Sequence, residues 1–286
     1  MRVVVLGPGS VRPSTVALWP ANADPARIHD AAWIDTGEHG GWTMGRAQAD
    51  AGRAALAALR AGHELALART VDALVTAPVS KAALHLAGEK VEGQTELLGR
   101  WCGVDRCEMM AIAGRLRVML LTRHMPLRRA IEMITTERVL DRLELFDASL
   151  KRLGIARPKL ALAGLNPHAG EGGILGSEDE EILRPAVGTA RKRGIDVEGP
   201  LSPDTVFLAA SNGAFDGVLA LYHDQAFIPV KLLSHDGGVT VVAGLPYLRV
   251  SPVHGTAFDI AGRGIASASN LIAALQQAAA WCVPRG

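Results

Sequence analysis

Short runs of β-branched and other apolar residues alternate along this chain with longer segments rich in alanine and leucine. A short apolar run is typical of a buried strand, whereas a longer segment with apolar residues near helical spacing indicates a helix. The alternation therefore predicts an α/β fold with a largely parallel sheet. We expect strands at residues 3–6, 73–76, 109–113, 116–121, 159–163 and 216–221, and helices at 43–68, 78–86, 136–153, 178–193 and 271–281.

Three of these segments carry additional local signals. Gly62 interrupts the Ala/Leu-rich segment 43–68, which is either one long helix or two shorter ones. Gly114-Arg115 separates two apolar runs and predicts a hairpin. The helix at 178–193 has acidic residues in its first turn and basic residues in its last, as the helix dipole favours, and Gly194 follows it.

Length and charge limit the class of protein. The 286 residues suit one large or two medium domains, and three cysteines are too few for a disulfide framework. The net charge of +1 argues against binding to nucleic acid or to an anionic membrane surface. No apolar stretch approaches the roughly 20 residues of a membrane span, and the N-terminus lacks a signal-peptide pattern. We therefore expect a cytoplasmic globular protein.

Histidines follow three of the predicted strands. His124 lies after the strand at 116–121, His168 after 159–163 and His223 after 216–221. Ligands of open α/β sheets bind at the carboxyl ends of strands, and three imidazoles suit Zn²⁺ or another divalent metal while leaving one position open. A single histidine at such a place is more often a hydrogen-bonded loop residue, but the three together favour a metal site.

Other candidate binding residues lie near the C-terminus. The glycine-rich segment 254–266 fits either a nucleotide-binding loop or an ordinary glycine-rich helix start. Lys231 and Arg249, both near predicted loops, are candidates for an anion pocket. The chain has no dinucleotide-binding glycine fingerprint, no P-loop and no nucleophile elbow, which disfavours the corresponding enzyme classes.

Several motifs occur in a fixed order from about residue 76 to the C-terminus. They are Thr76-Ala77-Pro78-Val79-Ser80-Lys81, Ala87-Gly88, Gly93-Gln94-Thr95-Glu96, Asn166-Pro167-His168-Ala169-Gly170-Glu171-Gly172-Gly173, Gly199-Pro200-Leu201-Ser202-Pro203-Asp204-Thr205, Tyr222-His223-Asp224-Gln225, Gly244-Leu245-Pro246 with Arg249, and His254-Gly255-Thr256-Ala257 through Gly262-Arg263-Gly264. Together they resemble the 4-hydroxythreonine-4-phosphate dehydrogenase (PdxA) family.

The resemblance implies a fold and a reaction. The fold is a two-domain α/β/α architecture like that of isocitrate and isopropylmalate dehydrogenases, with the active site in the interdomain cleft. Residues 1–77 and 241–286 would form the cofactor-binding domain, with a shortened N-terminal part, and 78–240 the substrate, metal and dimerisation domain. The reaction is the NAD- or NADP-dependent oxidation of 4-phosphohydroxy-L-threonine to 2-amino-3-oxo-4-phosphobutanoate. That product decarboxylates to 3-amino-2-oxopropyl phosphate, a step of pyridoxal 5'-phosphate biosynthesis.

The resemblance also implies roles for individual residues. A divalent metal (Zn, Mg or Co) would be held by His124, His168 and His223 in a homodimer whose active site is shared between subunits. The expected substrate-binding residues are Gln94, Thr95, Lys231, Thr240 and Arg249. The expected catalytic residues are Asp204, Asp224 and Lys81. The expected cofactor-binding residues are His254, Gly255, Thr256, Ala257 and Asp259.

The chain departs from the family pattern in three places. Gln94 stands where the family has histidine, Thr240 where it has asparagine, and the region before Thr76 is shorter than usual. The first two motivate an alternative, a PdxA-like paralogue that oxidises phospho-D-threonate or a carboxylated cis-dihydrodiol. The shorter N-terminal region motivates a second alternative, a non-catalytic metal- or nucleotide-binding relative.

Overall fold

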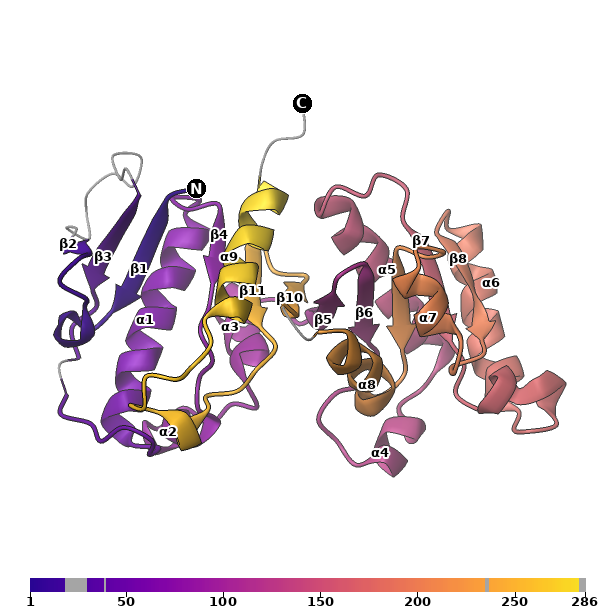
Figure 1. The fold of residues 1–286 in the computed structure, drawn as a ribbon. Helices are drawn as coiled ribbons and strands as arrows, with labels where there is room; N and C mark the ends of the chain where they lie inside the picture. The colour runs from indigo at the N-terminus through magenta and orange to yellow at the C-terminus, as the bar shows by residue number, and fades with distance from the viewer. Residues whose placement is uncertain (19–29, 39, 235–236, 283–286) are drawn as a thin grey trace. The chain divides into compact units, whose positions relative to one another are not determined.

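The structure is a computed structural model that describes residues 1–18, 30–38, 40–234 and 237–282 (Figure 1). The chain forms two compact units. Unit 1 combines Met1–Asp105 with the described residues from Leu245 to Cys282, and unit 2 is formed by Arg106–Gly244. None of the described helices combines the length and apolar character that crossing a bilayer requires.

The first boundary between the units lies at residue 105, whereas the sequence placed it at residue 77. Residues 78–105 belong to unit 1 because helix α2 (Lys81–Leu86) packs closely on helix α1 (Ala49–Leu67). Gly52 of α1 permits this approach, since a Cβ there would lie 2.1 Å from the carbonyl oxygen of Ala83. The cofactor and substrate roles expected for the two domains stay predictions.

Unit 1 contains two sets of parallel strands. Strands β1, β3 and β2 form a sheet in the order β1-β3-β2, and β4 pairs with β11. Helix α1 packs on β1 and β4, and α9 packs on β4 and β11. The bounds are β1 Val3–Gly7, β2 Ala17–Leu18, β3 Ala31–Asp35, β4 Ala73–Val75, α3 Gln94–Cys102, β11 Leu248–Pro252 and α9 Ser269–Cys282.

Helix α1 passes through Gly62 without a break, which decides between the two alternatives that the sequence allowed. A Cβ at Gly62 would lie 2.7 Å from the Leu74 side chain and 3.2 Å from that of Leu6. The glycine thus lets α1 approach β1 and β4 closely and does not end the helix. The helix begins at Ala49, so the predicted start at residue 43 is wrong.

Unit 2 is built on strands in the order β10-β5-β6-β9-β7-β8. The pairs β10/β5 and β5/β6 are antiparallel, and β6/β9, β9/β7 and β7/β8 are parallel. This mixed sheet with its covering helices confirms the predicted α/β class and the hairpin at Gly114. The bounds are β5 Glu108–Ala113, β6 Leu116–Leu120, α4 Leu127–Glu132, α5 Thr136–Arg152, β7 Lys159–Ala163, α6 Arg184–Lys192, β8 Asp196–Leu201, α7 Val206–Ser211, β9 Gly217–Ala220, α8 His223–Leu233 and β10 Val239–Ala243.

Helices cover both faces of this sheet (Figure 1). Helices α7 and α8 pack on one face, where Phe207 and Phe227 join a buried cluster with Val118 of β6 and Val218 of β9. Helix α5 packs on the other face, where Phe146 lies against Gly217 so closely that a Cβ there would come within 2.3 Å of its ring. Because successive residues of a strand face opposite sides, Gly217 and Val218 contact the two different layers.

Two helix starts differ from their predictions. Helix α2 begins at Lys81 and not at Pro78, because the Ser80 hydroxyl oxygen accepts a hydrogen bond from the Ala83 amide and caps the helix. The predicted helix at 178–193 begins with a π-helical turn at Asp179–Leu183, and only Arg184–Lys192 is α-helical. The sequence reading missed β8, whose Gly199-Pro200 pair is typical of a turn.

Candidate functional site

The three predicted metal-binding histidines all belong to unit 2. Strands β6, β9 and β7 are parallel neighbours, so their carboxyl ends lie at one edge of the sheet. His124 follows β6, His223 begins α8 directly after β9, and His168 follows β7. The rings of His124 and His223 lie with their centroids 5.5 Å apart. The topology therefore gathers the three histidine-bearing segments at one edge.

His223 is held by its neighbours in a defined orientation. Its Nδ1 lies 2.8 Å from Oδ1 of Asp224, and its ring stacks on Phe227 with a centroid separation of 4.7 Å. A carboxylate that accepts from Nδ1–H leaves the Nε2 lone pair available, which is the usual state of a metal-binding histidine. Asp224, expected as a catalytic residue, is thus placed as the orienting partner of His223.

His168 lies in a turn of unusual backbone conformation. His168, Ala169 and Glu171 all have positive φ angles, of 54°, 55° and 43°, in a run continued by Gly170 and Gly172. Left-handed backbone costs a residue with a Cβ about 1–2 kcal/mol. The surrounding structure must therefore hold this turn, and with it the position of the His168 side chain.

Asp179 supplies that support. Its Oδ1 accepts from the Leu165 amide at 2.9 Å, and its Oδ2 accepts from the backbone and side-chain nitrogens of Asn166 at 3.1 and 2.9 Å. The Asp179 side chain is fully buried. Gly164 completes the packing, because a Cβ there would lie 2.9 Å from both Ala169 Cα and Asp179 Oδ1. Sequence reasoning missed Asp179, which stands in an acidic run that resembles a solvated helix start.

Asp204, the second expected acid-base residue, lies near His168. The Ser202 hydroxyl donates to Asp204 Oδ1 at 2.6 Å, and this hydrogen bond, with the nearby His168 as a smaller cause, lowers the pKa of Asp204. A carboxylate with a lowered pKa stays ionised at neutral pH. Asp204 is therefore suited to an electrostatic role beside His168.

The donor chemistry at this edge fits a divalent metal. The side-by-side imidazoles of His124 and His223 are ligands that Zn²⁺ and related ions accept, and Asp224 supports one of them as in known metal sites. Across the described part of the chain, however, no three His, Cys, Asp or Glu side chains form a cluster that could hold a metal ion. Within one copy of the chain, the three histidine side chains therefore do not converge on one metal position.

A second candidate cluster, in unit 1, surrounds Arg249 of β11. Its Nη2 donates to Thr76 Oγ1 at 2.6 Å and to Gln94 Oε1 at 3.0 Å. The guanidinium is buried, and no described residue accepts a hydrogen bond from its Nε. Burial lowers the pKa of Arg249 to about 10. A buried cation whose hydrogen-bond partners here are neutral oxygens is well suited to an anionic ligand.

Gln94 is fixed in orientation by this cluster. Its amide oxygen accepts from Arg249, and its amide nitrogen donates to the Ala77 carbonyl at 3.1 Å. Thr95 follows it as a buried residue of α3. Lys81, expected as catalytic, begins the nearby α2, where its Cε would lie 3.8 Å from a Cβ built on Gly93. The structure therefore brings Gln94 and Arg249 together, with Thr76 as a partner to which the sequence assigned no role.

The other expected substrate residues lie in unit 2. Lys231 is exposed near the end of α8, and Thr240 is buried in β10 opposite Ala111 of β5. Both stay predictions as substrate contacts.

The expected cofactor-binding segment follows β11 in unit 1. His254, Gly255, Ala257 and Asp259 are exposed, Thr256 is half-buried, and Ala257 has a left-handed backbone with a φ of 49°. The segment continues into a short 3-10 turn at Phe258–Ile260, and the next helix, α9, begins only at Ser269. It is thus a loop and not the start of a long helix, which leaves its backbone accessible to a ligand.

Comparisons with known proteins identify the family. The model of the family described as pyridoxal phosphate biosynthetic protein PdxA matches residues 10–278. A 4-hydroxythreonine-4-phosphate dehydrogenase of Maricaulis maris is 49% identical over 229 residues, which cover 78% of this chain and 67% of that protein. A D-threonate 4-phosphate dehydrogenase of Salmonella typhimurium is 44% identical over 234 residues, covering 82% of this chain and 72% of that protein.

Solved structures agree with the family assignment. The crystal structure of a 4-hydroxythreonine-4-phosphate dehydrogenase from Klebsiella pneumoniae superimposes with a TM-score of 0.85 at 36% identity, covering 98% of this chain and 90% of that one. Similarity of this extent in both sequence and fold goes well beyond a shared α/β architecture. The chain therefore belongs to the PdxA family of dehydrogenases.

Proposed function

We propose that this protein is an NAD- or NADP-dependent dehydrogenase that oxidises the hydroxyl group of a small phosphorylated hydroxy acid with the help of a divalent metal. The observation that carries the proposal is the set of histidines at the carboxyl edge of β6, β9 and β7. Two neighbouring imidazoles, one oriented by Asp224, have the chemistry of metal ligands. The relatives' dehydrogenase names support the reaction class.

Different residues of this chain would bind the metal, the phosphate and the cofactor. His124, His168 and His223 would hold the metal, which supplies Lewis acidity and lowers the pKa of a bound hydroxyl group. Arg249, with Lys231, would bind the phosphate and fix the orientation of the substrate. The loop at 254–259 would bind the cofactor, which would supply a nicotinamide ring as the hydride acceptor.

The first substrate candidate is 4-phosphohydroxy-L-threonine, oxidised to 2-amino-3-oxo-4-phosphobutanoate. D-Threonate 4-phosphate is the second candidate. Gln94 and Thr240, as departures from the family pattern, motivate a second candidate, and a relative of that name is 44% identical. Both substrates carry the phosphate that the buried Arg249 would bind.

Kinetics with both phosphorylated compounds test the proposal. Each would be supplied with NAD or NADP and with Zn²⁺, Mg²⁺ or Co²⁺, while absorbance reports the reduced cofactor. We expect turnover of at least one compound and its loss in a His168→Ala variant that retains less metal. Absence of turnover in every combination would refute the function, and unchanged activity and metal content in His168→Ala would refute the ligand assignment.

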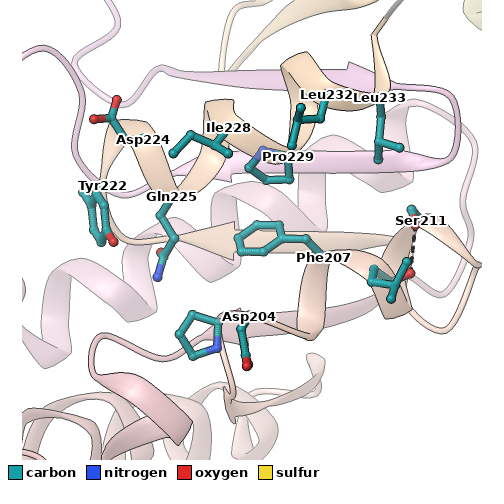
Figure 2. A pocket seen from close by; sticks show the side chains of 12 residues that line it. Asp204, Phe207, Ser211, Tyr222, Asp224, Gln225, Ile228, Pro229, Leu232 and Leu233 are labelled. Atoms are coloured by element: carbon teal, nitrogen blue, oxygen red, sulfur yellow. Dashed lines mark hydrogen bonds between the residues drawn. The ribbon is translucent and has the colours of Figure 1, made fainter.

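We further propose that the active protein is a homodimer in which a second copy completes the metal site. The open three-histidine set of one copy supports this. So does an apolar cavity of about 490 Å³ between α7 and α8, lined by Phe207, Ile228 and Leu232 among others (Figure 2). Leu208 and Leu232 are each 66% exposed there. Exposed apolar surface of this kind marks interaction sites.

Light scattering of wild type and of Leu232→Glu tests the dimer. We expect a dimer for the wild type, and a monomer with weaker metal binding for the variant, because the new carboxylate would be buried without a partner. Leu86→Glu is the matched control, since Leu86 is 59% exposed on α2 of the other unit. A monomeric wild type that is fully active would refute the shared site.

A further inference from the structure

Two buried polar side chains connect the strand ends of unit 2 that lead to the histidines. The Thr122 hydroxyl donates to the Leu221 carbonyl at 2.7 Å. The Gln225 amide oxygen accepts from the Leu221 amide at 2.7 Å, and its amide nitrogen donates to the Gly164 carbonyl at 2.8 Å. Thr122 is fully buried and Gln225 is 8% exposed. No metal-binding or catalytic role was expected for either side chain.

These hydrogen bonds join the three segments that lead to His124, His168 and His223. Thr122 follows β6 two residues before His124, Leu221 follows β9 two residues before His223, and Gly164 follows β7 in the segment that leads to His168. The ladder of the sheet ends at these points, so side chains must replace its hydrogen bonds. Thr122 joins the first segment to the second, and Gln225 joins the second to the third.

We propose that Gln225 is a positioning residue for the metal-binding histidines. The inference rests on the proposed metal-dependent function. A glutamine amide both donates and accepts, so one side chain fixes the spacing between the Leu221 and Gly164 segments. The bonds are buried, and a lost partner would leave a backbone group unpaired inside the protein. Both hydrogen bonds of the Gln225 side chain go to backbone groups, so its effect passes through the backbone of the two segments.

Zinc affinity of the full-length protein tests the proposal. Gln225→Met removes both amide groups at similar length and flexibility, and Thr122→Val removes only the bond between the first two segments. Zn²⁺ affinity would be measured by competition with a chromophoric chelator, and Co²⁺ absorption would report ligand geometry. By comparison with other supporting residues of metal sites, we expect Gln225→Met to weaken Zn²⁺ binding about 10-fold or more. Thr122→Val should have a smaller effect, with a changed Co²⁺ spectrum in both variants.

Two controls separate positioning from general stability. Gln277→Met changes the same residue type on the exposed face of α9 and should leave Zn²⁺ affinity unchanged. Val187→Ala removes buried core volume from α6 of the same unit without touching the strand ends. If Val187→Ala weakens Zn²⁺ binding as much as Gln225→Met at equal loss of thermal stability, the positioning role is refuted.

The remaining outcomes distinguish this inference from the proposed function. A wild-type protein that binds none of Zn²⁺, Co²⁺ and Mg²⁺ overturns the metal-dependent function, and the positioning role with it. If the wild type binds Zn²⁺ and Gln225→Met binds it equally tightly with an identical Co²⁺ spectrum, only the positioning role is overturned.

Discussion

Replacing Asp179 by asparagine should both destabilise unit 2 and disturb His168. The carboxylate accepts three hydrogen bonds, from the Leu165 amide and from two nitrogens of Asn166. An asparagine of the same shape can accept on one side only, so its NH₂ group would face a buried N–H. An unsatisfied buried donor costs about 1–3 kcal/mol. The remaining bonds lose their charge assistance, so we expect a total loss of about 2–5 kcal/mol in the free energy of unfolding.

The same turn offers a compensating change. Ala169 has a φ of 55°, and the left-handed conformation costs alanine about 1–2 kcal/mol but glycine almost nothing. Glycine loses more chain entropy on folding, about 0.5–1 kcal/mol, so Ala169→Gly should be neutral or stabilise by up to about 1.5 kcal/mol. It should also reduce the effect of Asp179→Asn in the double variant, because the turn then needs less support.

Urea unfolding of the single and double variants measures these energies, and hydrogen exchange at residues 164–173 localises them. Ala55→Gly in the middle of α1 is the matched control, since glycine costs about 1 kcal/mol in a right-handed helix. The reasoning fails if Ala169→Gly destabilises as much as Ala55→Gly. It also fails if Asp179→Asn costs less than about 1 kcal/mol, which would mean that the three bonds do not hold the turn.

Three further predictions concern both units. Inorganic phosphate should bind more weakly as the pH rises through about 10, where the buried Arg249 loses its proton, and calorimetry at pH 8 and 10.5 would show this. Because the unfolded chain holds that proton more tightly, this group's contribution to stability rises with pH above about 10. Gln94→His should make phosphate affinity increase on acidification below about pH 6.5, measured by the same titration, because an imidazolium adds a positive charge beside Arg249. Gly164→Ala should cost about 1–3 kcal/mol in urea unfolding, whereas Gly188→Ala, with nothing within 4 Å of the added Cβ, should not.

Local sequence signals predicted best those helices and strands whose apolar spacing defines a buried face. The apolar run at 159–163 became β7 and the amphipathic segment at 136–153 became α5, because each buries a face that its own spacing defines. Element starts were less predictable. Thr43 to Gln48 precede α1, and Asp179–Leu183 forms a π-helical turn, since capping and packing partners far along the chain decide where a helix begins.

In the candidate site, too, the sequence predicted some residues, whereas others became recognisable only in the tertiary structure. Strand ends and residue types were enough to single out His124, His168 and His223, because parallel strands place their carboxyl ends at one edge. Asp179 and Gln225 could not be given a structural role from the sequence, since an acid in an acidic run and a glutamine after a histidine look like solvated residues. Only burial and specific backbone partners distinguish them.

The sequence by itself determined the α/β class, the ordered motifs of the PdxA family and the residue types available for metal and phosphate binding. These depend on side-chain chemistry and on periodicity, which are local properties. The tertiary structure decided that Gly62 continues a helix, that Arg249 is a buried cation among neutral oxygens, and that His168 lies in a left-handed turn held by Asp179. Each of these depends on residues distant in the chain, because burial and hydrogen-bond partners exist only once the strands have paired and the helices have packed on them.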